Sequence, residues 1–442
     1  MAYVREIQNK KGISYKVEVS NGYDSNKKKI RATTTFVPDP CMTKKQQKKA
    51  LEKFVYEFEE KVKNGNCIRG EKITLEKFVK EWVDAFASNQ LEKTTYTAYM
   101  DTIEKIILPS LGQMKLSKIR PYHIEKFYIS LTQDNARRDG KPGGYSYGSI
   151  CRFRIILSSI LSSAEHWDLI DSNPCRKARL PKQAEQTEKV KCFTADQAKR
   201  FLKYVDDCCN ELKPQPLPGQ THSSFADSNA YVLQMQYQVF FQIAIFGGLR
   251  RGEILALEWK NIDFEHSKIH IKQAANYVKG EIIIKPPKTK DSVRYVTVPH
   301  SVISILEEYQ KKQDSYKKRL GSGWKGKDWL FIQSDGSIMH VNTPYNKFHK
   351  LIKEYNCHAS KEDLLPVLSL HDLRHTNASL LVRSNKVDTK TISKKLGHSD
   401  MATTMKYYIH SYEESEQETA EILEDMLVET NEQSNKQSLN SR

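Results

Sequence analysis

The first forty residues carry a strand-like pattern of polar and apolar positions. The segments "YVREI", "SYKVEVS" and "KKIRATTTFV" alternate in polarity or are rich in β-branched residues, and the turn-forming stretches "NKKG" and "NGYDSNKKK" separate them. In the following segment Leu51, Phe54 and Phe58 recur at helical spacing, and Gly65 marks its end. Residues 1–65 are therefore expected to form a small three-stranded sheet with one helix.

Residues 66–182 show helical periodicity over most of their length. One helix is expected after the capping residue Thr74, and the longest lies in "SYGSICRFRIILSSILSSAEHWDLI". Lys, Arg, Tyr and Ser are interleaved along these helices, which suits contact with a DNA backbone, although an ordinary helical domain can have the same composition. Arg152 and Arg154 on the longest helix are the candidates for such contacts.

A third domain is expected at residues 190–412, after the polar linker "LPKQAEQTEKVKCF". It opens with a helix capped by Thr194, and a later apolar helix is interrupted at Gly247 and Gly248. The segments "SKIHIKQA" and "GEIIIKPPKTKDSVRYVTVP" predict a small antiparallel sheet, with "PKTKDS" as a hairpin tip from which Lys290 points outward. The expected fold is multidomain α+β: a sheet with a helix, an all-helical domain, and a mainly helical domain with a small sheet.

The charge distribution indicates a polyanionic partner. The 442 residues carry a net charge of +16; nine acidic and two basic residues give the segment 411–442 a charge of −7, which leaves +23 on the rest. Such an excess favours binding of nucleic acid over a generic solubilising role. Lys27, Lys28 and Lys29 lie together at a turn of the N-terminal sheet and are candidates for contact with DNA.

Other compositional features indicate the compartment. No stretch approaches the roughly 20 apolar residues that a membrane helix needs, and the first residues contain no apolar signal segment. The eight cysteines include no Cys-x-x-Cys pair, which argues against a disulfide framework and against a cysteine zinc site. A cytoplasmic protein is expected.

The segment "LSLHDLRHTNASLLV" places charged residues inside a pattern typical of a core helix. His371 and His375 are spaced i, i+4, which would put both on one helical face, as in a zinc site. His371 and Arg374 are spaced i, i+3, which also shares a face and suits binding of a phosphate. The segment alone does not decide between these two kinds of site.

Five short motifs, in one order, resemble the tyrosine recombinase (phage-type integrase) family. They are "GGLRRGEILALEW", a "KTK" segment, "HDLRH", "LGHS" and "TTMKYYIH". The resemblance extends over nearly the whole chain. It implies an arm-type DNA-binding domain at 1–65, a core-binding domain at 66–182, a catalytic domain at 190–412 and an acidic tail at 413–442, as in integrases of phages and integrative conjugative elements.

The resemblance implies a role for each matched residue. The positions that match the family's catalytic set are Arg250, Lys290, His371, Arg374, His398 and Tyr408. The two arginines would hold the non-bridging oxygens of a phosphodiester, because a guanidinium binds them bidentately and stays charged. Tyr408 would attack the phosphorus after His371 accepts its proton, and Lys290 would protonate the departing 5′ oxygen. His398 would donate to a phosphate oxygen, and Glu253 would orient Arg250.

The chemistry that this set implies needs no cofactor. The 3′-phosphotyrosine product conserves the energy of the broken bond, so rejoining requires neither ATP nor a metal. A zinc site is disfavoured, because Asp372 stands where a metalloprotease helix has a glutamate and Arg374 would repel the cation. Two matches have weaker rivals: Tyr407 adjoins Tyr408, which the Tyr-x-His pattern favours, and Lys288 lies close to Lys290.

The function implied is that of a site-specific recombinase that integrates and excises a mobile element. A catalytically silent DNA-binding factor of the same fold is disfavoured because every matched position is filled. A type IB-like topoisomerase is disfavoured because of the separate N-terminal sheet. The implied partners are double-stranded DNA with core and arm sites, other copies in a homotetramer, and accessory excision and DNA-bending factors, at the nucleoid of a bacterial cytoplasm.

The acidic tail contains one expected helix with an apolar stripe. The residues of this stripe are Ile422, Leu423, Met426 and Leu427. Because related recombinases dock their C-terminal segment on a neighbouring protomer, the same is expected here; packing within one chain is the alternative.

Overall fold

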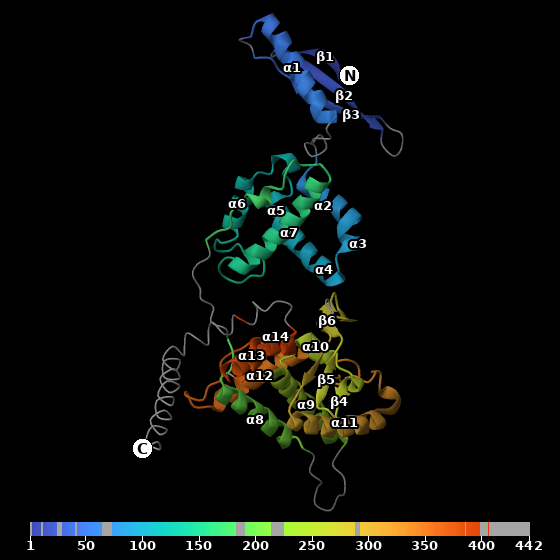
Figure 1. Ribbon diagram of the computed structural model, residues 1–442, viewed down its shortest axis with the longest axis vertical. Coiled ribbons are helices and arrows are strands. Elements are labelled where there is room, and N and C mark those ends of the chain that lie inside the picture. The colour runs from blue at the N-terminus through green and yellow to red at the C-terminus, as the bar shows by residue number, and fades with distance from the viewer. Residues whose placement is uncertain are drawn as a thin grey trace, which may run out of the picture. The chain divides into compact units, whose positions relative to one another are not determined.

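The computed structural model describes residues 2–9, 12–23, 29–39, 42–63, 73–182, 191–213, 225–287, 292–384, 386–397 and 405. The chain separates into two compact units, residues 1–186 and 187–442, which are described one at a time (Figure 1). No helix within the described ranges is long and apolar enough to span a membrane.

The N-terminal part of the first unit is a three-stranded antiparallel sheet. Its strands, in the spatial order β1-β2-β3, are β1 Ala2–Asn9, β2 Gly12–Tyr23 and β3 Lys29–Phe36. Helix α1, Lys44–Lys63, lies along the sheet (Figure 1). Val17, Val19 and Ala32 are buried with Val62 of the helix, so alternate strand positions face α1 as the polarity pattern predicted.

The helical part of the first unit has an apolar core of its own. Its helices are α2 Leu75–Trp82, α3 Ser88–Gln90, α4 Lys93–Thr102, α5 Leu108–Leu111, α6 Pro121–Ser130 and α7 Tyr147–His166, with π-helical turns at Val83–Ala87 and Ile103–Ile107. Thr74 caps α2 by accepting the N–H of Lys77. Trp82 is fully buried, and its indole N–H donates to Ser163 Oγ at 2.9 Å, which joins α2 to α7.

The second unit packs helices around two small sheets. Its helices are α8 Ala195–Glu211, α9 Phe225–Gln242, α10 Arg251–Leu255, α11 His300–Leu320, α12 Thr343–His358, α13 Asp372–Arg383 and α14 Thr389–Leu396. Its strands are β4 Ile262–Asp263, β5 Lys268–Ile271, β6 Ala274–Val278, β7 Glu281–Lys285 and β8 Arg294–Thr297. The rings of Phe201, Phe241 and Phe348 contact one another in the core, so α8, α9 and α12 are fixed together. The expected multidomain α+β class is confirmed.

The sheet pairing in this unit differs from the expected hairpin. β7 pairs with β6, whereas β8 pairs with β5 in a different sheet. The two-residue turn between β6 and β7 is Lys279-Gly280, with φ values of 48° and 92°, as in the type I′ turns that match strand twist. The expectation that the segment around Lys290 is the tip of a hairpin was therefore wrong; it connects two sheets.

Candidate active site

The break between α9 and α10 is shaped by a left-handed glycine. α9 continues into a π-helical turn, Ile243–Gly247, and Gly248 follows with a φ of +65°. A Cβ on Gly248 would lie 2.7 Å from Asn377 Oδ1, so only glycine fits. Asn377 Nδ2 donates to the carbonyls of Ile245 (2.7 Å) and Phe246 (3.1 Å). The helix end is therefore held from α13.

Arg374 lies in the first turn of α13 and is only 3% exposed. The helix begins after His371, and the carboxylate of Asp372 accepts the N–H of Ser369 at 2.6 Å. Nη1 of Arg374 donates to the carbonyl of Gly248 at 2.8 Å. Because a buried guanidinium is costly without partners, this bond both stabilises Arg374 and fixes the loop that leads into α10.

Arg250 occupies the N-cap position of α10. The carboxylate of Glu253 accepts the Arg250 backbone N–H at 3.0 Å and its Nη1 at 2.9 Å, while Nη2 donates to the carbonyl of Gly397 at 3.1 Å. The Arg250 side chain is nevertheless 41% exposed. The guanidinium is thus anchored by two partners and still presents surface to an anionic ligand.

Glu253 binds a second arginine, Arg294 at the start of β8, which the sequence reasoning missed. Arg250, Glu253 and Arg294, with the carbonyls of Lys395 and Gly397, form one hydrogen-bonded network. Nη2 of Arg294 lies 2.9 Å from Glu253 Oε2, and its Nε donates to the carbonyl of Lys395 at 2.9 Å. Both side chains of the ion pair are buried. One signal was available: Arg294 shares the inward-facing positions of β8 with Val296, and an arginine placed there must find a buried anion.

Glu253 is held as an anion between the two arginines. Burial acts to raise the pKa of its carboxyl group, but the hydrogen bonds and charges of Arg294 and Arg250 outweigh burial and keep the pKa below its ordinary value. A charged Glu253 at neutral pH can orient both guanidinium groups.

The imidazole of His371 lies in a positively charged environment. Desolvation, the neighbouring His375 and the charges of Arg374 and Arg250 lower the pKa of His371 from 6.5 to about 4. Part of the residue remains exposed to solvent. His371 is therefore neutral at physiological pH and able to accept a proton, and it shares one site with the two matched arginines.

The two histidines of the alternative zinc site do lie together. The ring centroids of His371 and His375 are 4.7 Å apart, and His375 Nε2 lies 3.9 Å from Asp372 Oδ1. Within the ranges that the structure describes, no group of three or more His, Cys, Asp or Glu side chains is arranged to hold a metal ion. Arg374 lies between the two histidines in the chain and is part of the same site.

Three matched catalytic residues, Lys290, His398 and Tyr408, lie outside the described residues, as do their rivals Lys288 and Tyr407. Two described residues that lie near them in the chain nevertheless take part in the network around Arg250 and Glu253. Gly397 directly precedes His398 and accepts a hydrogen bond from Arg250. Arg294 follows Lys290 by four positions and binds Glu253.

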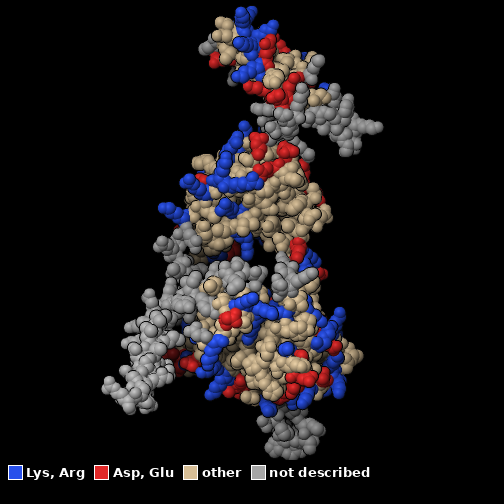
Figure 2. Space-filling view, viewed as in Figure 1, with Lys and Arg blue, Asp and Glu red and all other residues tan. Residues whose placement is uncertain are grey.

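The candidate DNA contacts differ in their surroundings. Lys27 and Lys28 lie outside the described residues, and the backbone of Lys29 pairs with Tyr23 at the start of β3. Arg152 on α7 is exposed, whereas Arg154 is half-buried. Figure 2 shows Lys and Arg side chains distributed over the visible surface of both units. Of the two arginines on α7, Arg152 is the better placed for an external anion.

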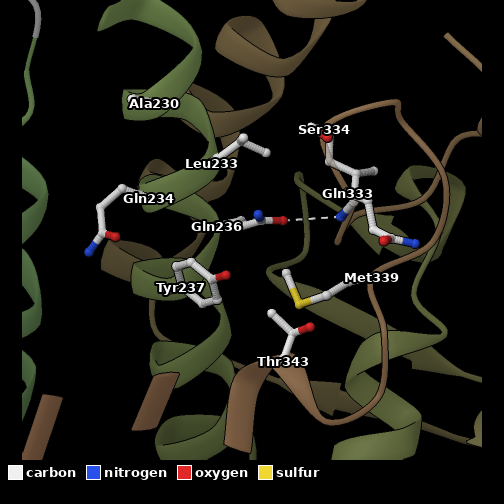
Figure 3. Close-up of a pocket in the computed structure, with 10 residues that line it drawn as sticks. Ala230, Leu233, Gln234, Gln236, Tyr237, Gln333, Ser334, Met339 and Thr343 are labelled. Atoms are coloured by element: carbon white, nitrogen blue, oxygen red, sulfur yellow. Dashed lines mark hydrogen bonds between the residues drawn. The ribbon is translucent and has the colours of Figure 1, made fainter. Parts of the chain in front are cut away.

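A separate cavity of about 330 Å³ lies beside α9, lined by residues that include Gln234, Tyr237 and Met339 (Figure 3). Gln236 accepts the N–H of Ile332 at its wall at 3.0 Å. None of its lining residues is charged. It therefore lacks the cations that a phosphodiester requires and is distinct from the arginine site.

Comparison with protein families finds two matches along the chain. Residues 220–415 match the phage integrase family, and residues 74–132 match the N-terminal SAM-like domain of phage integrases. The first match contains all the candidate catalytic residues. The second covers helices α2 to α6 of the helical part.

Individual relatives and a solved structure agree with these matches. The ICEBs1 integrase of Bacillus subtilis (strain 168) is 30% identical over 287 residues, which cover 64% of this chain and 67% of that protein. A XerC-like tyrosine recombinase of Caldanaerobacter subterraneus is 24% identical, over 94% of this chain and 96% of its own. The fold is similar to that of a Tn1549 transposon integrase fragment in complex with a circular intermediate DNA (TM-score 0.58, 19% identity, 78% of this chain and 99% of that one).

Proposed function

The chain belongs to the phage integrase family of tyrosine recombinases, and we propose that it integrates and excises a mobile element by cutting and rejoining DNA through a 3′-phosphotyrosine intermediate. One observation carries the proposal beyond the family. Arg250 at the start of α10 and the pair His371 and Arg374 at the start of α13 come from two distant segments of the chain and meet in one site, where the charges of both arginines act on the imidazole.

The two arginines would bind the scissile phosphate. A phosphodiester carries one negative charge, and attack on phosphorus builds further charge on its non-bridging oxygens. Preorganised guanidinium groups stabilise that charge more than they stabilise the ground state. Arg250 is suited to this role because Glu253 and Gly397 fix it while part of its surface stays exposed.

His371 would act as the proton acceptor for the nucleophile. A phenol has a pKa near ~10 and is a poor nucleophile while protonated. The neutral imidazole of His371 can take the proton of Tyr408, and the neighbouring guanidinium charges favour the phenolate. Lys290 would then protonate the 5′ oxygen that leaves, and His398 would donate to the phosphate.

The proposed domain roles follow the organisation of the chain. The sheet and α1 (1–65) would bind arm-type DNA, 66–182 would bind the core site together with the catalytic domain at 190–412, and 413–442 would dock on a neighbouring protomer. Joining two duplexes requires four strand cuts, so we propose a homotetramer on DNA. Accessory excision and bending factors would select the direction, and the reaction would take place on the bacterial chromosome.

Trapping on a suicide substrate tests the proposed function. A nicked half-site loses the short strand that carries the 5′ hydroxyl after cleavage, so a covalent protein–DNA complex should accumulate and resist denaturation. Formation should need no ATP and should be unaffected by a chelator. A protein that binds the half-site but never forms the covalent complex would instead be the catalytically silent factor. A requirement for a metal ion would contradict the proposed chemistry.

A further inference from the structure

Arg294 joins three segments that each border a proposed catalytic residue. Through Glu253 it contacts the helix start that carries Arg250, and through the Lys395 carbonyl it contacts the end of α14 that leads to His398. Its own strand begins shortly after Lys290. We propose that Arg294 is a positioning residue for strand cleavage, which sets the orientation of Arg250 and the path of the chain toward His398. This inference rests on the proposed function of those residues.

The shape of the Arg294 guanidinium is what allows the three contacts. Nη2 and Nη1 face the two oxygens of Glu253 at 2.9 Å and 3.3 Å, while Nε is directed to the Lys395 carbonyl at 2.9 Å. Nη1 also donates to the carbonyl of Ser292 at 3.2 Å, next to the segment that carries Lys290. A lysine has the same charge but no planar fork, so it cannot make these bonds together.

Gly397 lies against both arginines of the network. Its φ is +68°, and a Cβ there would lie 2.9 Å from Arg294 Nη1 and 3.0 Å from Arg294 Cζ. Its carbonyl accepts the bond from Arg250 Nη2 at 3.1 Å. The residue before His398 is therefore packed on one arginine and bonded to the other. A shift of Arg294 would be transmitted to Arg250 and to His398.

A purely stabilising role explains this arrangement less well. A buried ion pair often contributes little net stability, because the cost of removing two charges from water offsets their attraction. The side-chain hydrogen bonds of Arg294 go to Glu253, Lys395 and Ser292, which all lie in segments around the site. Another arginine of the same unit, Arg200, pairs with Asp363 outside this network and offers a matched control.

The test separates DNA binding from cleavage. Arg294→Lys keeps the charge next to Glu253 but loses the fork. Single-turnover cleavage of a suicide half-site should fall about 10²-fold, the effect typical of misplacement by ~1 Å, while the Kd for the half-site stays unchanged. Arg200→Lys should leave both quantities unchanged. Wild-type cleavage by folded Arg294→Lys would overturn the inference.

A double-mutant cycle adds a measurement that a general loss of stability would not change. If Arg294 acts through Glu253, then Arg294→Lys combined with Glu253→Gln should cleave no more slowly than the slower single variant. Losses that multiply fully in the double variant would show that Arg294 does not act through Glu253 and would overturn the inference that it orients Arg250.

A second pair of variants applies if Arg294→Lys does not fold. Gly397→Ala places a methyl group against the Arg294 guanidinium, whereas Gly280→Ala, in the β6–β7 turn, is also at a positive φ (+92°) but has no atom within 4 Å. Only Gly397→Ala should slow cleavage; equal rates would overturn the inference. Arg250→Ala distinguishes failure of the proposed function from failure of the positioning role of Arg294 alone. Normal cleavage by Arg250→Ala would contradict the proposed function, whereas its loss beside normal Arg294 and Gly397 variants would contradict only the positioning role.

Discussion

Arg374 Nη1 donates to the carbonyl of Gly248 at 2.8 Å, across 126 positions of the chain. Gly248 ends the helix before Arg250, so the position of one proposed phosphate-binding arginine depends on the other. Asn377, on the same helix as Arg374, holds the two carbonyls that precede this loop. The two arginines are therefore parts of one packed structure, and substitutions at either should affect both.

Arg374→Lys should reduce cleavage by roughly 10²–10³-fold, the loss typical for one preorganised donor. A lysine keeps the charge but cannot bond Gly248 and the phosphate with one planar group. The measurement is the single-turnover rate on a suicide half-site. Arg383→Lys, an exposed change on the same helix, is the control and should cleave normally. Cleavage by Arg374→Lys at the control rate would rule out the phosphate-binding role.

Tyr408→Phe should abolish the covalent protein–DNA complex and leave DNA binding intact, because the change removes only the nucleophilic oxygen. Trapping assays and gel-shift titrations measure the two properties separately. Tyr407→Phe is the matched control and should still trap. The opposite result, with trapping by Tyr408→Phe and none by Tyr407→Phe, would move the nucleophile to Tyr407.

The cleavage rate should be insensitive to His371 protonation from pH 8 to about 6 and should fall as the pH approaches 4. The reason is the lowered pKa of His371, about 4, which keeps the base neutral over the upper range. A histidine of ordinary pKa would begin to lose activity near 6.5. Rate–pH profiles on the suicide substrate measure this, and an inflection near 6.5 would contradict His371 as a base with a lowered pKa.

The same pKa shift should make stability depend on pH. As the pH falls below 6.5, the unfolded chain binds a proton at His371 before the folded chain does, so this group lowers the free energy of unfolding between 6.5 and about 4. The drop in Tm from pH 7 to 4.5 should be smaller in His371→Gln than in the unaltered protein. His300→Gln, at the start of α11, is the control. An unchanged drop in His371→Gln would contradict the shift.

Deletion of residues 1–65 should preserve cleavage of an isolated core site at high protein concentration and impair integration at low concentration. The sheet and α1 have an apolar core separate from that of the helical part, and every proposed catalytic residue lies at or after Arg250. A protein that binds arm and core sites together gains effective concentration at the weaker site, and the deletion removes that gain. Loss of both activities would make the sheet part of the core-binding structure.

Much of this protein is determined by local sequence. Polarity patterns predicted the three N-terminal strands and α1, and Thr74 and Thr194 cap helices as expected. These features depend on neighbouring residues, whose side-chain directions follow from the local backbone period. The order and types of the motif residues also predicted the family, because phosphate binding and phenol activation demand particular side chains.

The tertiary structure decided what depends on contacts between distant segments. The pairing of β8 with β5 rather than β7, the burial of Arg294 against Glu253, and its bond to the Lys395 carbonyl 101 positions away have no counterpart in local periodicity. The lowered pKa of His371 likewise arises from desolvation in the folded chain and from the charges of His375, Arg374 and, on another helix, Arg250. Desolvation and electrostatic interactions act through space, so only the folded chain determines which charges face one another.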